Sequence, residues 1–325
     1  MVSKQVANQS SIVNRQSSVA LKLSIVVVSW NTRQLLHDCL AAVYAYPPDC
    51  AFEVWVVDNC SHDGSAAMVR EDFPQALLLE SEDNLGFAGG NNRAITRSGG
   101  EYVLLLNPDT EVKPGALTAL AAFLDGHPEA GGAGSMLLNG DGSLQHPSCH
   151  PLPTLSRELW RLFHLDALAA YGVYRMDRWD TAVPHPVDII QGASFMLRRS
   201  VLDAVGLLDD SYFMYSEEVD LCFRIRRAGW LLYWVPQSQV VHYGGQSTQQ
   251  VADKMFIELY RGKVHYFRKN YGVRSAAVYK AVLALAALPR VLAGLVGRLI
   301  PGPVGAAGKR VGGNYGRLLR ELPDL

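Results

Sequence analysis

The stretch from Tyr102 to Asp109, with the sequence YVLLLNPD, is the feature that most restricts the fold. Its apolar run predicts a strand buried on both faces, and Pro108, which cannot donate to a β-ladder, marks the end of that strand. Such strands belong to parallel sheets covered by helices, and these sheets bind ligands at the carboxyl ends of their strands. The sequence therefore places Asp109 at the ligand-binding edge of an α/β sheet.

The carboxylate of Asp109 has two interpretations at this point. At the carboxyl edge of a sheet it can bind a hard divalent cation through oxygen, with a diphosphate as the second ligand of that cation. It can instead cap the helix predicted to begin near Pro114, or close a turn formed by Asn107, Pro108 and Asp109. Both interpretations remain open from this stretch alone.

Three similar units precede this strand in the chain. Apolar runs at 23–28, 53–57 and 76–79 predict buried strands, and each is followed by a polar loop and a helical pattern. The loop after the first strand lacks the G-x-G-x-x-G pattern of a dinucleotide-binding fold. The predicted class is therefore α/β, with a mostly parallel, Rossmann-like sheet flanked by helices.

The loops after the second and third strands are richer in polar and small residues than a turn requires. Asp58 and Asn59 open the first of these loops, and Asp58 is placed to accept a hydrogen bond from a nucleobase. The second loop contains a glycine-rich run at 84–93 that precedes a predicted helix. Its backbone N–H groups can approach a phosphate there, and Arg93 adds positive charge. Together the loops predict a nucleotide site.

A group of acidic residues opens another predicted helix. Ser216 is a suitable N-cap, so Glu217, Glu218 and Asp220 fall in the first helical turn. Acids at this end of a helix offset its dipole, and Asp220 can also pair with Arg224 one turn later. One acid is enough for that purpose. Three crowded acids raise one another's pKa, as a general base requires.

The residues around this helix add shorter elements. His242 ends a predicted strand after the acidic helix and is therefore a candidate metal ligand, although a lone histidine is more often a hydrogen-bonded side chain. The other expected elements are strands at 133–137, 187–190, 193–197, 231–235 and 239–242, a turn at 139–142, and an aromatic helical insertion at 154–183.

Composition describes a globular chain. Of the 325 residues, 49% are hydrophobic and 19% charged, and the formal net charge of −1 gives no indication of nucleic-acid binding. Residues 1–21 are rich in Ser, Gln and Asn and lack the apolar core of a signal peptide, which predicts a disordered tail and a cytoplasmic protein. The five cysteines form no C-x-x-C pair, so neither a disulfide framework nor a zinc site is indicated.

The chain after Gly272 is both apolar and basic. Pro289 and Arg290 interrupt its longest apolar segment, and a charge at the centre of a spanning helix is costly, so a transmembrane span is not predicted. An interfacial helix on the anionic cytoplasmic face of a membrane is the favoured interpretation. The alternative is a helix that packs on the preceding domain. The basic residues are Arg274, Lys280, Arg290, Arg298, Lys309, Arg310, Arg317 and Arg320.

Taken in order, these motifs resemble glycosyltransferase family 2, the inverting nucleotide-sugar glycosyltransferases of GT-A fold, in its bacterial rhamnosyltransferase-like branch. The resemblance covers about residues 22 to 270, and it implies a GT-A catalytic domain at 22–250 followed by a helical extension at 251–325. The matching stretches are 24–31, 57–65, 84–92, 106–110, 191–196 and 213–230.

The resemblance also implies roles for particular residues. Asp109 belongs to a DxD-type motif for Mg²⁺ or Mn²⁺, which His242 completes in some relatives, and Glu217 and Glu218 form the motif that supplies the base. Two residues depart from the family pattern: Asn107 replaces an Asp, and Glu218 stands where Asp is usual. The residues expected to contact the nucleotide-sugar are Ser29, Asn31, Asp58, Asn59, Asn84, Gly86, Asn91 and Asn107.

The expected reaction moves a sugar from a dTDP- or UDP-sugar, with L-rhamnose from dTDP-L-rhamnose as the first choice, to a hydroxyl of a lipid-linked or cell-surface polysaccharide acceptor. The expected location is the inner face of the cell membrane, and a second copy of the chain is a candidate partner. Two other functions compete with this one: a nucleotidyltransferase that makes a nucleotide-sugar, and a non-catalytic sugar-binding homologue.

Overall fold

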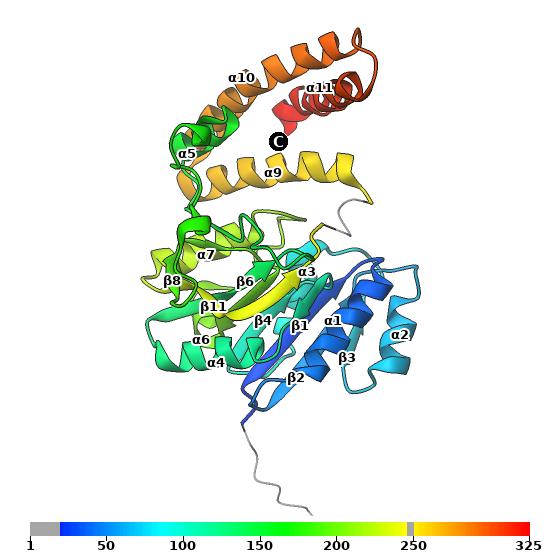
Figure 1. The fold of residues 1–325 in the computed structure, drawn as a ribbon, viewed down its shortest axis with the longest axis vertical. Coiled ribbons are helices and arrows are strands. Elements are labelled where there is room, and N and C mark those ends of the chain that lie inside the picture. Colours follow the sequence, from blue (N-terminus) through cyan, green and yellow to red (C-terminus); the bar gives the residue numbers. More distant parts are fainter. Residues whose placement is uncertain (1–19, 246–249) are drawn as a thin grey trace, which may run out of the picture.

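A computed structural model describes residues 20–245 and 250–325. An α/β layer carries a stack of C-terminal helices, which lie above one edge of its sheet in Figure 1. The large sheet has the strand order β3-β2-β1-β4-β10-β6-β11-β5, with β8 paired to β11. The predicted disordered tail at 1–21 lies outside the described residues except for its last two positions.

The first half of the sheet is parallel, as predicted. The strands are β1 (Leu23–Ser29), β2 (Phe52–Asp58), β3 (Leu77–Glu80) and β4 (Tyr102–Leu106), and the intervening helices are α1 (Arg33–Ala45), α2 (Ser65–Asp72) and α3 (Gly86–Ile95). All residues of β4 are buried, as its unbroken apolar run requires. Because β1, β2 and β4 are parallel neighbours, their following loops meet at one edge of the sheet.

The second half of the sheet is mixed. Its elements are β5 (Thr110–Val112), α4 (Ala116–Gly126), β6 (Ala130–Leu138), β10 (Ser194–Arg198), α6 (Arg199–Val205), α7 (Glu217–Arg227) and β11 (Leu231–His242). β11 is one strand where two were predicted, at 231–235 and 239–242. A register shift between Val235 and Gln239 lets the strand pass Pro236, which has no N–H for the ladder.

The region between β6 and β10 is less helical than predicted. It contains β7 (Cys149–His150), α5 (Leu155–Leu162), two short 3₁₀ turns (Leu165–Ala167 and Met176–Arg178), β8 (His185–Val187) and β9 (Ile189–Ile190). Thr154 caps α5 by accepting a hydrogen bond from the backbone N–H of Arg157. The rest of the predicted insertion consists of turns that pack Trp179 against Trp234, with ring centroids 5.3 Å apart.

Two apolar cores lie on opposite faces of the sheet. Alternate residues of β1 divide between them, since Ile25 and Val27 belong to the core under α1, α2 and α4, whereas Val26 belongs to the core under α3, α6 and α7. The second core continues into the C-terminal helices through residues such as Phe267 and Tyr279. These helices therefore share the core of the sheet.

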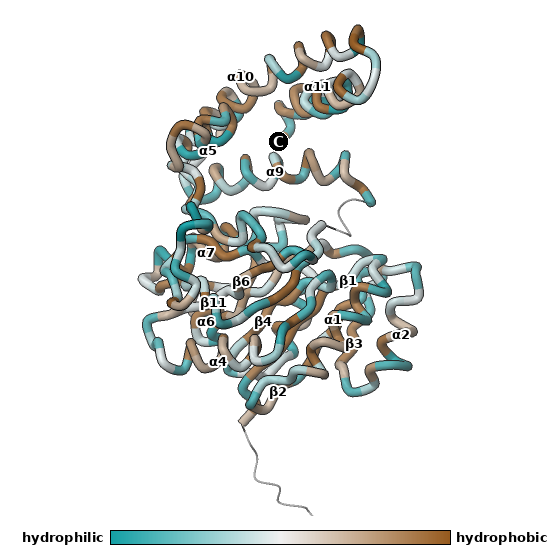
Figure 2. The backbone as a smooth tube through the Cα atoms, in the orientation of Figure 1, coloured by the Kyte–Doolittle hydropathy of each residue, from teal (hydrophilic) through white to brown (hydrophobic). Residues whose placement is uncertain are grey.

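The C-terminal helices are α9 (Ala252–Tyr271), α10 (Val273–Gly297) and α11 (Pro303–Glu321), followed by a 3₁₀ turn (Leu322–Asp324). Gly272, at φ 88°, separates α9 from α10 in a conformation that favours glycine. The apolar segment that Pro289 and Arg290 interrupt in the sequence belongs to one helix, because α10 continues through Pro289. The carbonyl that loses its partner belongs to Leu285, an exposed residue, so the lost hydrogen bond falls outside the core. Figure 2 shows α10 as a largely hydrophobic tube at the end of the molecule.

Candidate active site

A cavity of about 360 Å³ opens at the carboxyl ends of β1, β2 and β4. That volume is within the range of small-molecule sites. The predicted residues Ser29, Asn59, Asn84, Gly86, Asn107 and Asp109 line it, together with Val28, Trp30, Phe87, Pro108, Phe213, Met214, Gly245, Val251, Lys254 and Met255. The other predicted site residues are not part of its lining: Asn31, Asp58, Asn91, Glu217, Glu218 and His242.

Asparagine side chains shape the loops that form the cavity floor. Asn59 donates to the carbonyl of Gly86 at 3.0 Å and to Asn84 Oδ1 at 3.0 Å, and its own Oδ1 accepts from the N–H of Leu85. Asn31 accepts from the backbone N–H of His62 at 2.8 Å, which joins the loops after β1 and β2. The amides of Asn59 and Asn31 are thus engaged within the protein and hold the loops in place.

Asp58 lies just behind this floor. The side chain is buried, and Oδ2 accepts from the backbone N–H of Ser61 at 3.2 Å. Oδ1 is buried without a hydrogen-bond partner among the described residues. A buried carboxylate oxygen without a donor is costly, and a ligand N–H would satisfy it.

The glycine-rich run differs from its predicted role. Its glycines were expected to precede a helix, but α3 begins at Gly86 and includes the others. A Cβ on Gly86 would lie 2.0 Å from the carbonyl oxygen of Phe213, and one on Gly90 would lie 2.7 Å from Val28 Cγ1. These glycines therefore allow close packing of α3. Asn91 donates back to Phe87 within the helix, and Arg93 donates to Ser81, so both side chains have hydrogen-bond partners within the protein.

The register of two short strands brings Asp109 and His242 together. Thr110 of β5 pairs with His242 of β11, and the N–H of Tyr243 donates to the carbonyl of Asp109 at 2.9 Å. His242 Nε2 consequently lies 3.4 Å from Asp109 Oδ1 and 3.4 Å from Asn107 Nδ2. The interpretation of Asp109 as a helix cap is excluded, since Gly115 occupies the N-cap position of α4.

The donor set around Asp109 fits a divalent cation in part. A carboxylate and an imidazole 3.4 Å apart match two ligands of one cation with bonds of ~2.1 Å. Among the described residues, no group of three or more His, Cys, Asp and Glu side chains could hold a metal alone. The remaining ligands would be the Asn107 amide, water and ligand phosphate, an arrangement typical of Mg²⁺ bound with a phosphorylated substrate.

Glu217 and Glu218 begin α7. Ser216 occupies the N-cap position at φ 73° but its side chain makes no capping hydrogen bond, so the predicted side-chain cap is absent. Each glutamate has a buried Oε2 without a partner in the described chain. Burial, reinforced by the charge of Glu218, raises the pKa of Glu217 well above its usual value, and burial likewise raises the pKa of Glu218.

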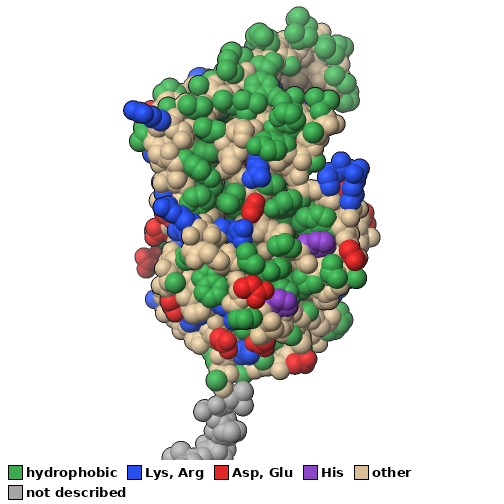
Figure 3. Space-filling model, turned by 90° about the vertical axis from the view of Figure 1, so that its left-hand side faces the viewer, with side chains coloured by type: hydrophobic (Ala, Val, Ile, Leu, Met, Phe, Trp, Pro, Cys, Tyr) green, Lys and Arg blue, Asp and Glu red, His purple; other side chains and the backbone are tan. Residues whose placement is uncertain are grey.

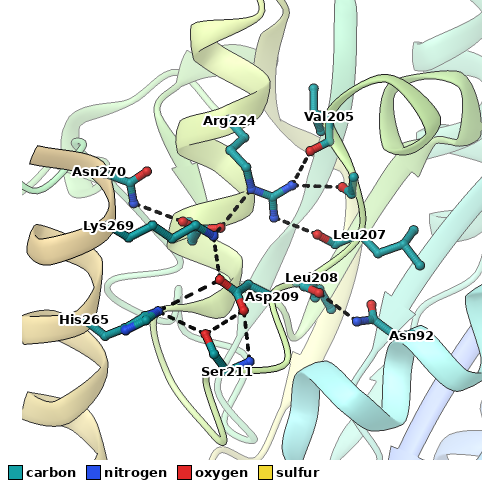
Figure 4. Close-up of polar contacts among 12 residues, drawn as sticks. Asn92, Val205, Leu207, Leu208, Asp209, Ser211, Arg224, His265, Lys269 and Asn270 are labelled. Atoms are coloured by element: carbon teal, nitrogen blue, oxygen red, sulfur yellow. Dashed lines mark hydrogen bonds and ion pairs between the residues drawn. The ribbon is translucent and has the colours of Figure 1, made fainter.

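Asp220, the third acid, is paired with basic and amide side chains around it. Arg224 donates to it at 2.8 Å, as the sequence predicted, and α9 adds Lys269 at 2.9 Å and Asn270 at 3.0 Å. Lys269 also donates to Asp209 at 2.6 Å, in the network that joins α7, α9 and the loop after α6 (Figure 4). The fully buried Asp220 thus serves structure, which leaves Glu217 and Glu218 as candidate bases.

Sequence reasoning missed the contribution of α9 to the cavity. Lys254 lines it with its ammonium 4.4 Å from the centroid of the Phe213 ring, a cation–π contact. Gly262 allows α9 to approach the turn before α7, because a Cβ there would lie 2.6 Å from the carbonyl oxygen of Tyr215. No local motif marks these residues; the only signal was a helical pattern in residues already assigned to a C-terminal extension.

A Rossmann-like mixed sheet with a nucleotide-sized cavity at its carboxyl edge, an acidic residue at the end of β4 and two acids opening α7 defines a nucleotide-sugar glycosyltransferase of GT-A fold. The chain belongs to glycosyl transferase family 2, whose model matches residues 24–206.

Relatives within the family include rhamnosyltransferases. The chain is 31% identical over 242 residues to the N-acetylglucosaminyl-diphospho-decaprenol L-rhamnosyltransferase of Mycobacterium tuberculosis (strain ATCC 25618 / H37Rv), covering 70% of this chain and 77% of that protein. It is 26% identical over 178 residues to the rhamnosyltransferase WbbL of Escherichia coli (strain K12), covering 53% and 66%. The family assignment made from the sequence motifs is therefore confirmed.

Solved structures of other glycosyltransferases share the fold. The mannosyltransferase PcManGT from Pyrobaculum calidifontis, in complex with GDP-Man and Mn²⁺, gives a TM-score of 0.55 at 19% identity, covering 94% of this chain and 85% of that one. GalNAc-T7 with UDP, GalNAc and Mn²⁺ gives 0.52 at 15% identity, covering 77% and 51%. The predicted GT-A fold is thus confirmed.

Proposed function

We propose that the protein transfers L-rhamnose from dTDP-L-rhamnose to a hydroxyl of a lipid-linked acceptor, with inversion at the anomeric carbon. The observation that carries the reaction type is the cavity at the sheet edge, where Asp109 lies beside His242. The choice of sugar and of a lipid-linked acceptor is supported by the 31% identity to a decaprenol-linked L-rhamnosyltransferase.

The nucleotide end of the donor would bind over the loops after β1 and β2. The unpartnered Asp58 Oδ1 is suited to accept the ring N–H of a thymine or uracil base. Trp30 lines the same cavity and offers an aromatic surface. Lys254, on the α9 side, adds a positive charge for the diphosphate.

Asp109 and His242 would hold Mg²⁺ or Mn²⁺, with Asn107 beside them. When bound, the cation offsets negative charge on the departing nucleoside diphosphate. Asn107, which replaces the first acid of the motif, adds no charge to the site. Asp109 is therefore the only carboxylate lining the cavity among the described residues, and the site should depend strongly on it.

A glutamate at the start of α7 would act as general base. The acceptor oxygen attacks the anomeric carbon as the bond from that carbon to the phosphate oxygen breaks, the nucleoside diphosphate departs, and the acceptor proton passes to the glutamate. Glu218 is the better candidate, because its side chain is half-buried whereas Glu217 is only 3% exposed. A raised pKa makes either carboxylate a stronger proton acceptor.

Membrane association is proposed from the surface of α10. Within the described residues, α10 is the one helix long and apolar enough to cross a membrane, with a mean hydropathy of 1.7. Its packing on α9 and α5, and the bonds of Arg290 to the Leu162 carbonyl and His164, favour a helix lying at the surface of a bilayer over one that spans it. Peripheral attachment at the cytoplasmic face would place the protein beside a lipid-linked acceptor.

The direct test uses purified protein, Mn²⁺ and a panel of dTDP-, UDP- and GDP-sugars. We expect dTDP-L-rhamnose to raise the unfolding temperature most and to be hydrolysed slowly without acceptor, because the relative that is 31% identical is an L-rhamnosyltransferase. Greater protection by another nucleotide-sugar would overturn the choice of donor. Adding a polyprenyl-diphospho-N-acetylglucosamine should convert slow hydrolysis into transfer; failure with it, but transfer to a soluble glycan, would overturn the choice of acceptor.

A further inference from the structure

A chain of hydrogen bonds leads from the turn after β6 to His242. Ser143 Oγ lies 2.6 Å from Asp141 Oδ1, and Asn139 Nδ2 lies 2.9 Å from Ser143 Oγ. Gln145 Nε2 then lies 3.1 Å from Asn139 Oδ1, and Gln145 Oε1 lies 2.7 Å from His242 Nδ1. The sequence marked this region only as a turn.

The direction of these hydrogen bonds, from donor to acceptor, is determined by Asp141 at the end far from His242. A carboxylate can only accept, so the hydroxyl of Ser143 donates to Asp141, and the hydroxyl oxygen is left to accept from Asn139 Nδ2. That bond orients the amide of Asn139 with Oδ1 toward Gln145. Gln145 must present its NH₂ group to this oxygen.

A second acceptor fixes Gln145 independently. Its Nε2 also donates to the backbone carbonyl of His242 at 2.8 Å, and a carbonyl cannot donate. Oε1 therefore faces His242 Nδ1, which must carry the hydrogen of this 2.7 Å bond. In the neutral ring, Nε2 then keeps a lone pair, which agrees with the N–H donor of Asn107 placed 3.4 Å from it.

This lone pair faces a carboxylate. Nε2 is 3.4 Å from Asp109 Oδ1, and both side chains are buried, with His242 5% and Asp109 6% exposed. Two acceptors facing each other away from solvent repel, and a cation bound to both removes the repulsion. If the neutral ring took the opposite tautomer, Nδ1 and Gln145 Oε1 would be two acceptors 2.7 Å apart.

We propose that Gln145 is a positioning residue that holds His242 in the Nδ1–H tautomer and so keeps Nε2 available for a divalent cation shared with Asp109. The inference rests on the proposed metal role of Asp109 and His242. It assigns to the turn at 139–145 a function in preparing the metal site.

The tautomer can be read without metal and without activity. In full-length protein labelled with ¹⁵N-histidine, His242 is assigned by its loss from the spectrum of His242→Asn. We expect the neutral ring to have a protonated Nδ1 and a pyridine-like Nε2. A neutral ring protonated at Nε2 in the metal-free wild type would overturn the inference, because it would show that the Gln145 contact does not select the tautomer.

Two substitutions test whether Gln145 acts through its side-chain oxygen, as a hydrogen-bond acceptor, or only through the shape of its side chain. Gln145→Leu removes the oxygen that accepts from Nδ1–H, and Gln145→Glu retains such an oxygen. Loss of a residue that orients a metal ligand typically weakens binding ~10- to 100-fold. We therefore expect Mn²⁺ affinity, followed by electron paramagnetic resonance, to fall by about that factor in Gln145→Leu and by only a few-fold in Gln145→Glu.

The outcomes distinguish this inference from the function on which it rests. If wild type binds Mn²⁺ and a folded Gln145→Leu variant binds it equally well, the role of Gln145 fails and the metal site stands. If wild type shows the Nδ1–H tautomer but binds no Mn²⁺, with or without dTDP, the metal role of Asp109 and His242 fails, and the purpose assigned to Gln145 fails with it. Unfolding temperatures establish that each variant is folded.

Discussion

At the scale of the residue, buried carboxylate oxygens without partners mark the candidate active site. Asp58 Oδ1, Glu217 Oε2 and Glu218 Oε2 are all buried and unpaired among the described residues. Each such atom costs ~1–3 kcal/mol of folding free energy. Buried acids elsewhere in the molecule are paired, as Asp220 is with Arg224 and Lys269. Hydrogen-bond pairing thus distinguishes the buried acids that stabilise the fold from those whose oxygens are available to a ligand.

Removing the carboxylate of Asp109 should abolish transfer without unfolding the protein. Asp109→Ala deletes the only carboxylate that lines the cavity in the described chain, so we expect turnover to fall at least ~10²-fold. Stability should hold, since His242, at 3.4 Å, is the only polar partner of this side chain among the residues that the structure describes. Turnover with Mn²⁺ and with excess chelator, beside thermal unfolding, measures both. Full activity of the variant in chelator would contradict the metal role.

Glu218→Gln tests the base. The amide keeps the size of the side chain but cannot take a proton, so kcat should fall at least ~10²-fold while binding of the donor persists. Glu217→Gln should have a much smaller effect. Because burial raises the pKa of both groups, the wild-type rate should decline with acidification at a pH above the usual carboxyl value of 4.5. A reversed ranking of the two variants would assign the base to Glu217.

The same raised pKa has a consequence for stability. The folded protein binds the Glu217 proton more tightly than the unfolded chain, so the stability this provides is complete below pH ~4.5 and is lost as pH rises through the raised pKa. Glu217→Gln keeps a neutral group at every pH. Urea unfolding from pH 4 to 9 should therefore show the variant gaining stability relative to wild type as the pH rises. A constant difference across this range would contradict the assignment.

Residue-level prediction rests on local sequence at some positions and on tertiary pairing at others. Asp109 was predicted at the sheet edge because a buried strand and Pro108 fix its place. His242 is distant in sequence, and only the pairing of β5 with β11 brings it to Asp109. Asn59 carries a suitable side chain, but its amide is engaged by the neighbouring loop, which no sequence pattern reveals.

At the scale of the element, α9 packs against α7 and the turn before it. The two helices are joined by Lys269 and Asn270, which both donate to Asp220. Gly262 permits the approach, and Tyr215 and Ser216 are held at positive φ in the turn that it meets. Non-glycine residues in that conformation cost of order 1–3 kcal/mol and persist only when surrounding contacts hold them. The contact of α9 therefore fixes the position of the candidate base.

Gly262→Ala should disturb this contact. The added Cβ would lie 2.6 Å from the carbonyl oxygen of Tyr215, so the helix and turn must separate, at a cost of ~1–3 kcal/mol in unfolding free energy. Gly313→Ala in α11 is the matched control, because its Cβ meets no atom within 4 Å and alanine favours a helix. We expect a lower unfolding temperature and lower kcat for the first variant only. Equal behaviour of the two would contradict a tight contact.

Two elements continue past a proline for the same physical reason. The sequence predicted two strands at 231–235 and 239–242, on either side of Pro236, and an apolar segment interrupted by Pro289, yet β11 and α10 are continuous in the structure. A proline removes one hydrogen bond and restricts its neighbours, but packing on both sides can outweigh that local cost. β11 absorbs Pro236 in a register shift, and α10 is held by its contacts with α9 and α11.

At the scale of the whole molecule, the sheet edge that bears the cavity faces the C-terminal helices, and these helices end in an apolar surface. Figure 3 shows hydrophobic side chains gathered over that end of the molecule. Six residues at helical spacing form the apolar stripe of α10, an arc of roughly 100° on a helix with 3.6 residues per turn. They are Val278, Leu285, Leu288, Leu292, Leu295 and Val296, all exposed.

The position of Arg290 changes the membrane argument made from the sequence. Arg290 was counted as a charge within the apolar segment, but on α10 it lies roughly opposite the apolar stripe. There it bonds to the carbonyl of Leu162 and to His164, and it stacks 5.1 Å from the ring of Tyr315. The stripe can thus meet lipid while Arg290 stays within the protein. The sequence could not show this, because the orientation follows from packing on α5 and α11.

The last prediction is that the apolar stripe and its neighbouring cations bind anionic bilayers. Full-length protein should float with vesicles containing anionic lipid, and Leu288→Gln combined with Leu295→Gln should weaken that binding about tenfold or more, since each buried leucine contributes ~1.5–3 kcal/mol. Substituting exposed residues is preferable to deleting the helices, because Tyr279 and Leu283 belong to the core. Leu168→Gln, at an 81% exposed residue in the insertion, is the matched control and should float as wild type does.

The charges decide the lipid preference and are tested separately. Arg298, Lys309 and Arg310 are exposed near the end of α10 and the start of α11, where each cation close to an anionic surface contributes ~1 kcal/mol. Replacing all three by glutamine should remove the preference for anionic over neutral vesicles while the stripe remains intact. No flotation of the full chain, or equal flotation of the stripe variant and Leu168→Gln, would show that α10 does not attach the protein to a membrane.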